Sequence, residues 1–214
     1  MSRITVLGGT GYAGGHIVRA AAARGHDVTS ISRALPADQV AGVRYVTGSV
    51  LDDAVLASAV ADAEVVISAL APRGELVGRV RPVLATLAGL AGDAGVRLGV
   101  IGGAGSLLVA PGGPRLADTA SFPEAFKEEA AEMSSVLDDL RAREDDVDWF
   151  YVSPAAGFGS YAPGEATGTY RLGDDVLLAD ADGTSAISGA DLADAVVTEI
   201  ETPAHHRRRF TVAY

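Results

Sequence analysis

The sequence predicts a single α/β domain over residues 1–214, built on a doubly wound, Rossmann-type parallel sheet. Short apolar runs typical of strands alternate with runs of helical spacing through most of the chain. A glycine-rich turn follows the first apolar run and opens the first helical run. No linker of biased composition and no internal repeat divides the chain, so we expect one domain with a small C-terminal substrate-side region.

The predicted elements follow one another with short connections, which favours right-handed crossovers between parallel strands. We expect strands at residues 4–7, 28–32, 44–47, 64–70, 98–101, 147–152 and 209–212, and helices at residues 14–24, 56–60, 77–91, 123–143 and 191–201. Gly25 and Gly95 stand where two of these helices should end, and Asp52 precedes a third. A Gly-Asp-Asp turn separates residues 169–172 from residues 176–179, which predicts a β-hairpin.

Composition and charge exclude several classes of protein. The chain has no cysteine, which rules out disulfides, thiolate metal sites and cysteine nucleophiles, and no metal site is expected. A net charge of −11 disfavours binding to nucleic acid or to anionic lipid. No signal-peptide pattern and no apolar run of about 20 residues is present. We therefore expect a cytoplasmic protein with a small-molecule partner; monomer and homodimer both remain open.

The glycine-rich turn GGTGYAGG has the spacing of a dinucleotide-binding loop. Gly9, Gly11 and Gly14 match G-x-G-x-x-G, and Gly8 starts the overlapping G-x-x-G-x-x-G variant. Gly8 and Gly9 permit a tight turn, Gly11 lets a pyrophosphate approach the backbone, and Gly14 allows close helix packing. The following helix offers free N–H groups and the positive end of its dipole to phosphate. No Gly-Lys-Ser/Thr follows, so the turn is not a P-loop.

The residue at the end of the second predicted strand bears on the choice of cofactor. Sites for NAD place Asp or Glu there to accept a hydrogen bond from the ribose 2′-hydroxyl, whereas this strand ends in Arg33. A guanidinium pairs with a 2′-phosphate and stacks on adenine. We therefore predict that NADPH is preferred over NADH.

The stretch from Gly8 to Arg33 resembles the NmrA-like and biliverdin reductase B-like group of atypical short-chain dehydrogenases/reductases, which includes NADH-flavin reductases. Further similar segments are residues 102–112, 115–130, 149–158, 168–183, 187–201 and 207–214. The resemblance covers essentially the whole chain. It implies a Rossmann sheet, NAD(P)H binding and reduction of a flavin or a similar flat acceptor.

The resemblance also implies positions for parts of the cofactor. The pyrophosphate would be lined by Thr10, Gly11, Tyr12 and Ala13. The nicotinamide ribose would lie over Ala69, Leu70 and Ala71, and the nicotinamide would lie near Pro154. The sequence leaves open whether Tyr12 lies over the phosphates or is a surface residue.

The catalytic motif of the wider superfamily is incomplete in this chain. Typical members use Tyr-x-x-x-Lys with a serine to protonate a carbonyl oxygen, but Pro123 stands four residues before Lys127. Reduction of a ketone develops an alkoxide that needs such a proton donor. Reduction of a conjugated ring does not, because its spread charge takes a proton from solvent. The missing phenol therefore argues against alcohol or sugar chemistry and is compatible with flavin, quinone or tetrapyrrole reduction.

Two residues are candidates for a catalytic role. Ser106, just beyond the fifth predicted strand, either hydrogen-bonds the substrate or nicotinamide carboxamide or caps a turn. Lys127 either holds the nicotinamide ribose or is a solvated lysine on a glutamate-rich helix.

Our first hypothesis is an NAD(P)H-dependent oxidoreductase that transfers hydride from NADPH to a planar conjugated acceptor. The alternative is a non-catalytic NmrA-like redox sensor that binds NADP and reports to a protein partner. A sugar-nucleotide epimerase or dehydratase is disfavoured by the missing tyrosine and the short C-terminal portion.

Overall fold

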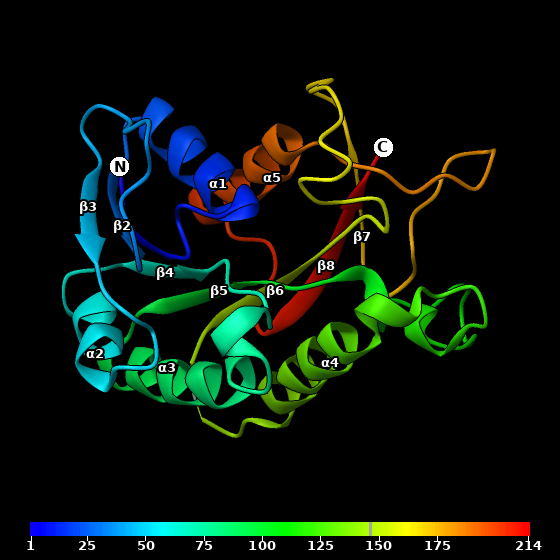
Figure 1. Cartoon of the computed structure of the whole chain (residues 1–214), viewed down its shortest axis with the longest axis horizontal. Coiled ribbons are helices and arrows are strands. Elements are labelled where there is room, and N and C mark those ends of the chain that lie inside the picture. The colour runs from blue at the N-terminus through cyan, green and yellow to red at the C-terminus, as the bar shows by residue number, and fades with distance from the viewer. Residues whose placement is uncertain (146) are drawn as a thin grey trace.

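The computed structural model describes residues 1–145 and 147–214, which form an eight-stranded sheet with helices on both faces (Figure 1). The strands are β1 (Arg3–Leu7), β2 (Asp27–Ser32), β3 (Arg44–Thr47), β4 (Val65–Ser68), β5 (Arg97–Ile101), β6 (Trp149–Pro154), β7 (Arg171–Gly173) and β8 (Arg208–Ala213). The helices are α1 (Tyr12–Ala23), α2 (Asp53–Ala61), α3 (Val80–Ala94), α4 (Lys127–Ala142) and α5 (Gly189–Glu201).

The strand order β3-β2-β1-β4-β5-β6-β8-β7 is that of a Rossmann sheet with an added edge, which confirms the predicted fold class. All strand pairs are parallel except β7 with β8. The chain first winds outward from β1 through β2 to β3 and then returns to pair β4 with the other side of β1. Leu7, at the end of β1, therefore lies between Ile31 of β2 and Ser68 of β4.

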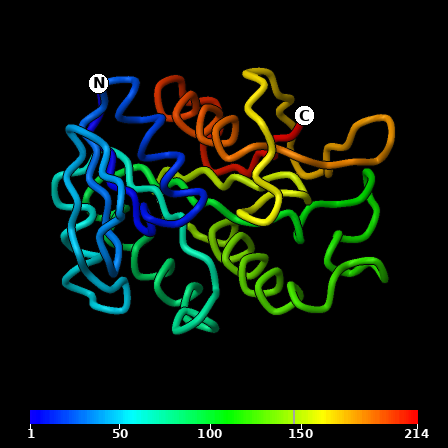
Figure 2. Tube along the Cα trace, turned by 45° about the horizontal axis from the view of Figure 1, so that its top comes forward, coloured from blue at the N-terminus to red at the C-terminus, as the bar shows by residue number. Residues whose placement is uncertain are grey.

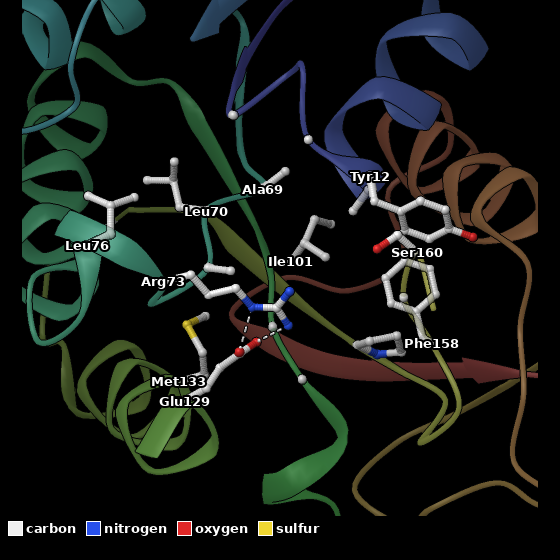
Figure 3. A pocket seen from close by; sticks show the side chains of 18 of the residues that line it. Tyr12, Ala69, Leu70, Arg73, Leu76, Ile101, Glu129, Met133, Phe158 and Ser160 are labelled. Carbon is white, nitrogen blue, oxygen red and sulfur yellow. Dashed lines mark hydrogen bonds and ion pairs between the residues drawn. The ribbon is translucent and has the colours of Figure 1, made fainter. Parts of the chain in front are cut away.

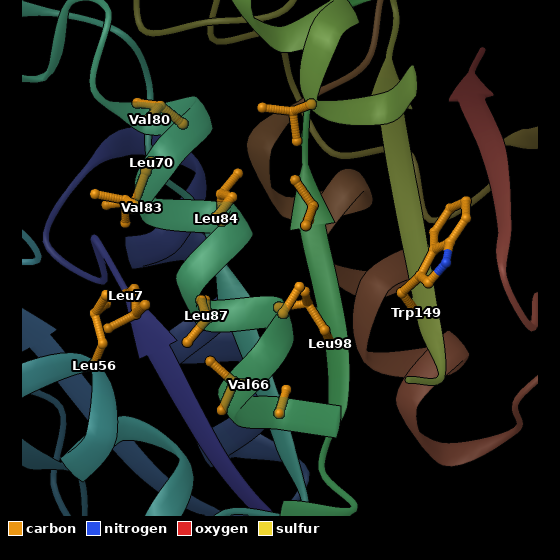
Figure 4. Close-up of a cluster of buried hydrophobic side chains, with 14 of the residues drawn as sticks. Leu7, Leu56, Val66, Leu70, Val80, Val83, Leu84, Leu87, Leu98 and Trp149 are labelled. Carbon is orange, nitrogen blue, oxygen red and sulfur yellow. The ribbon is translucent and has the colours of Figure 1, made fainter. Parts of the chain in front are cut away.

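Successive side chains of a strand point to opposite faces of the sheet, so the apolar strands make both faces apolar. Each face is therefore covered by a layer of helices. Helices α1 and α5 pack side by side on one face, and α2, α3 and α4 cover the other (Figure 1). On the second face, Leu84 and Leu87 of α3 lie against Val66 and Leu98 of the central strands (Figure 4).

The connections beyond β5 and after β7 lie at one end of the molecule, coloured green and orange in Figure 2. Leu108 and Val176 form a parallel bridge there, and the N–H of Leu177 donates to the carbonyl oxygen of Leu108 at 2.9 Å. The predicted hairpin of residues 169–172 with 176–179 is therefore wrong. Leu172 pairs with Val212 of β8 instead, because β8 offers β7 an open edge.

Helix ends follow local chemistry. Asp52 accepts a hydrogen bond from the N–H of Ala54 at the start of α2, and Gly25 and Gly95 adopt φ of +80° and +65° after α1 and α3. Helix α4 begins later than predicted because a 3₁₀ turn at Glu124–Phe126 precedes it. Within the described residues, no helix is long and apolar enough to cross a membrane.

A buried ion network joins the amino-terminal end of β5 to α5. Arg97 Nη2 donates to Glu199 Oε1 at 2.6 Å, and Arg97 Nε donates to Asp148 Oδ2 at 3.0 Å. The backbone N–H of His205 donates to Glu199 as well, at 3.0 Å. Burial opposes ionisation of Glu199, but the hydrogen bonds from Arg97 and His205 outweigh it and hold the pKa of the carboxyl below its usual value.

We expect Glu199→Gln to lower the free energy of unfolding by about 3 kcal/mol near neutral pH, because Arg97 would lose its buried carboxylate partner and keep only the more exposed Asp148. The depressed pKa means that this stabilisation is present above the unfolded value near 4.5 and is lost as the pH falls through the folded-state pKa. Urea unfolding of both proteins across the acid range measures the difference, which should shrink at low pH.

The matched control is the exposed pair of Arg81 with Asp139, whose Nε and Oδ2 atoms are 2.7 Å apart. Asp139→Asn should cause a far smaller loss, because solvent screens this pair. Equal losses in the two variants would contradict the stabilising role of the buried network.

Candidate functional site

A cavity of about 870 Å³ opens at the carboxyl ends of the parallel strands (Figure 3). Its walls include Gly8 after β1, Arg33 after β2, Ala69 after β4, Gly102 after β5 and Pro154 at the end of β6. Ligands of open α/β sheets bind at this edge, where the strand order reverses. The volume is typical of small-molecule and cofactor sites, roughly 300–1,000 Å³.

The glycine turn forms one end of the cavity. Gly8 adopts φ of +78°, and its N–H donates to the carbonyl oxygen of Ile31 at 2.9 Å. A Cβ on Gly14 would overlap the carbonyl oxygen of Gly8 and lie 2.9 Å from the Cα of Gly9. A side chain at position 14 would therefore push α1 away from the turn.

The start of α1 fits a pyrophosphate. The first intrahelical hydrogen bond joins the N–H of Gly15 to the carbonyl oxygen of Gly11 at 2.8 Å. The N–H groups of Tyr12 and Ala13 consequently have no acceptor within the helix. No acidic side chain lies in the first turn, and both residues line the cavity. Backbone donors, the helix dipole and the small cross-section of Gly11 all suit phosphate oxygens.

Arg33 stands at the same end, beyond the last residue of β2. Its Nη1 donates to Glu75 Oε1 at 2.8 Å, and both side chains are largely exposed. The Arg33 guanidinium therefore lies beside the glycine turn, where both solvent and a ligand can reach it. The pair is also easily separated, because exposed salt bridges contribute little.

Aromatic side chains form another part of the cavity wall. Phe122, Phe126, Phe158 and Tyr161 all belong to its wall, so three of the five phenylalanines of the chain are here. The rings of Phe126 and Tyr161 stack with centroids 6.0 Å apart and an interplanar angle of 25°. The ring of Phe158 lies 5.4 Å from the ring of Tyr12, so this wall adjoins the start of α1. This wall presents flat apolar surfaces to a ligand.

Arg73 and Glu129 also belong to the cavity wall, where they face each other (Figure 3). Arg73 Nε donates to Glu129 Oε2 at 2.9 Å, and Nη2 donates to Oε1 at 3.3 Å. The hydrogen bonds with Glu129 raise the pKa of Arg73 above its usual value, so the guanidinium stays charged. Sequence analysis missed this pair; the available signal was the position of Arg73, three residues after Leu70 and the apolar run of β4.

The structure gathers nearly all residues predicted to bind the cofactor. The lining of the cavity includes Gly8, Thr10, Gly11, Tyr12, Ala13, Arg33, Ala69, Leu70, Ala71 and Pro154. Gly14 lies behind this surface and acts through close packing. Which part of a dinucleotide each residue contacts stays a prediction.

The two candidate catalytic residues do not line the cavity. Ser106 is buried, and its Oγ accepts a hydrogen bond from Arg209 Nη1 at 2.7 Å. Lys127 is half-exposed and pairs through Nζ with Glu124 Oε2 at 2.7 Å. These contacts hold Ser106 in its own turn and Lys127 at the start of α4, and a catalytic role for either residue stays a prediction.

The segment that replaces the tyrosine motif does reach the site, where it presents Phe122, Pro123 and Phe126. Two phenols come from elsewhere in the chain. Tyr12 donates its hydroxyl to the carbonyl oxygen of Pro163 at 3.1 Å, and Tyr161 lies on the aromatic wall. The sequence argument that no phenol is available therefore holds for the 122–127 segment only. In the described residues, no cluster of three or more histidine and carboxylate side chains is placed to hold a metal ion.

The fold and this cavity define a Rossmann-type protein with a site suited to a dinucleotide, and comparison with known proteins agrees. The family model described as NAD(P)H-binding matches residues 8–203, and the chain belongs to this family. The uncharacterized protein YwnB of Bacillus subtilis is 36% identical over 212 residues, which are 98% of this chain and 97% of YwnB.

Solved structures are similar over almost their full length. A protein of Streptococcus pneumoniae, provisionally described as an NADH-flavin reductase, is 31% identical with a TM-score of 0.84 and covers 100% of this chain and 99% of its own. A protein of Bacteroides thetaiotaomicron, provisionally described as an epimerase, is 32% identical with a TM-score of 0.89 and covers 100% and 97%. These two names describe different reactions, so similarity alone does not select the chemistry.

We expect Gly14→Ala to weaken NADPH binding by at least about tenfold, because the added Cβ displaces α1 from the pyrophosphate. Fluorescence titration with NADPH measures the effect. Gly89→Ala in α3 is the control, since an added Cβ there meets no atom within 4 Å. That variant should gain about 1 kcal/mol of stability and bind as before. Unchanged NADPH binding in Gly14→Ala would contradict the assigned role of the turn.

Proposed function

We propose that this protein is an NAD(P)H-dependent oxidoreductase that uses NADPH to reduce a planar conjugated acceptor such as a flavin or a quinone. The observation that carries the proposal is that one cavity combines two kinds of surface. The glycine turn and the start of α1 offer backbone donors on one part of its wall, and four aromatic side chains form another part. A dinucleotide and a flat acceptor can therefore meet inside a single site.

The preference for NADPH is supported by Arg33 at the end of β2. Its guanidinium is exposed beside the glycine turn, where the 2′-position of the adenosine ribose lies in proteins of this fold. A 2′-phosphate offers a stronger partner than Glu75, because it carries more negative charge and accepts paired hydrogen bonds.

The choice of a conjugated acceptor is supported by the aromatic wall. Flat rings gain by stacking on Phe126 and Tyr161. When bound, NADPH supplies a hydride. The protein then has to align the acceptor and exclude water, and a conjugated ring needs no acid–base pair such as the superfamily motif provides.

We expect reduction of at least one of FMN, a quinone and biliverdin, each offered separately with NADPH, and no reduction of an aliphatic ketone. Loss of NADPH absorbance measures the rate. Phe126→Ala should raise KM for the active acceptor roughly 2- to 10-fold, because a stacking surface is lost. Tight NADPH binding without reduction of any acceptor would overturn the reductase function and favour the NADP-binding sensor.

We expect Arg33→Asp to raise the Kd of NADPH about 10- to 100-fold and that of NADH far less, because only NADPH carries the 2′-phosphate. Glu75→Gln removes the competing carboxylate and should tighten NADPH binding. Both dissociation constants follow from fluorescence titration. Equal losses for the two nucleotides in Arg33→Asp would refute the cofactor preference.

A further inference from the structure

We propose that Arg73 is the anion contact of the acceptor: it pairs with the negative charge that the acceptor ring gains during reduction. This inference rests on the proposed function. It assigns a positively charged residue to the part of the same site that would hold the acceptor. The observation behind it is an ion pair between Arg73 and Glu129 among apolar residues of the cavity wall.

The geometry of the pair distinguishes Arg73 from the other arginines near α4. Its side chain is 61% exposed and that of Glu129 is 29% exposed, and both residues line the cavity. Around the pair, the lining is formed by the apolar side chains of Leu76, Ile101 and Met133 (Figure 3). Solvent screens the pair in the free protein, but an acceptor bound against this apolar lining would exclude water and so strengthen charge–charge interactions there.

Short local constraints hold Arg73 in this position. The N–H of Arg73 donates to the carbonyl oxygen of Ala71 at 2.8 Å, and its carbonyl oxygen accepts from the N–H of Leu76 at 3.1 Å. On the other side, Tyr151 donates its hydroxyl to the carbonyl oxygen of Met133, which fixes α4 against β6. The turn after β4 thus positions the Arg73 guanidinium, and the first turns of α4 position the Glu129 carboxylate that pairs with it.

The reaction itself creates a need for a cation here. Hydride leaves NADPH with two electrons and joins the acceptor, so NADPH is oxidised to NADP⁺ and the neutral acceptor ring gains one negative charge. A proton from water later neutralises that charge. A guanidinium placed beside the ring before the reaction stabilises the anion and the transition state that leads to it. Glu129 neutralises Arg73 until the acceptor charge replaces it as a partner.

Riboflavin is a suitable probe because its ring is neutral when oxidised and anionic when fully reduced at mildly alkaline pH, and it carries no phosphate. The experiment measures Kd for both forms by anaerobic calorimetry, with 2′-phospho-ADP-ribose filling the glycine-turn end. The ratio of the two constants reports how strongly the site prefers the anion, and it requires no turnover.

Arg73→Met should reduce the preference for reduced riboflavin about 10- to 100-fold, because one charge-assisted hydrogen-bond partner is lost. Arg73→Lys should restore part of it. Glu129→Gln should shift the ratio the other way, since the competing carboxylate is removed. In turnover, Arg73→Met should lower kcat more than it raises KM.

Arg81→Met is the matched control. Arg81 also reaches α4 with paired hydrogen bonds, to Asp139 at 2.7 and 2.8 Å, but it does not line the cavity. It should leave the ratio unchanged. If the wild type reduces flavin and Arg73→Met keeps the wild-type ratio, the role of Arg73 is refuted and the proposed function stands. If the wild type neither binds riboflavin nor reduces any acceptor, the proposed function fails, and the inference about Arg73 fails with it.

Discussion

The backbone contact between Gly14 and Gly8 determines where everything else at the site can lie. Because no Cβ separates the two residues, the start of α1 approaches the carboxyl end of β1 to within backbone contact. Tyr12 and Ala13 then line the cavity, and the ring of Tyr12 reaches Phe158. Close packing at this one point therefore brings the start of α1 against the aromatic wall.

The fold was predictable where the determinants are local. The runs that became β1, β4 and β5 are apolar on both faces, and capping at Asp52 and Gly95 set helix ends from a few neighbouring residues. The pairing of β7 was not predictable in this way. It depends on β8, about forty residues later, and Asp175, expected in a hairpin turn, accepts from Arg209 Nε at 2.8 Å instead.

The residues of the site also fall into those that local sequence predicts and those that it does not. A glycine turn between a strand and a helix has a fixed sequence spacing, so its position in the cavity could be predicted. Arg73, Glu129 and the neighbouring Phe158 and Tyr161 come from three separate segments, and only the folded chain brings them together. Ser106 has a plausible position in the sequence, but its hydroxyl points to Arg209, and that direction depends on a strand 103 residues away.

The position of β8 between β6 and β7 also has a kinetic consequence. Strand β7 precedes β8 in the chain, yet in the part of the chain that the structure describes its only strand partner is β8, and β8 in turn pairs with β6. The segment from Arg171 to Gly173 can therefore pair only after β8, which follows α5 in the chain, has paired with β6. We expect β8 to join the sheet before β7, although β7 comes first in the sequence. Such non-local pairing adds loop-closure entropy to the barrier, and we expect the edge to be the last part of the sheet to form.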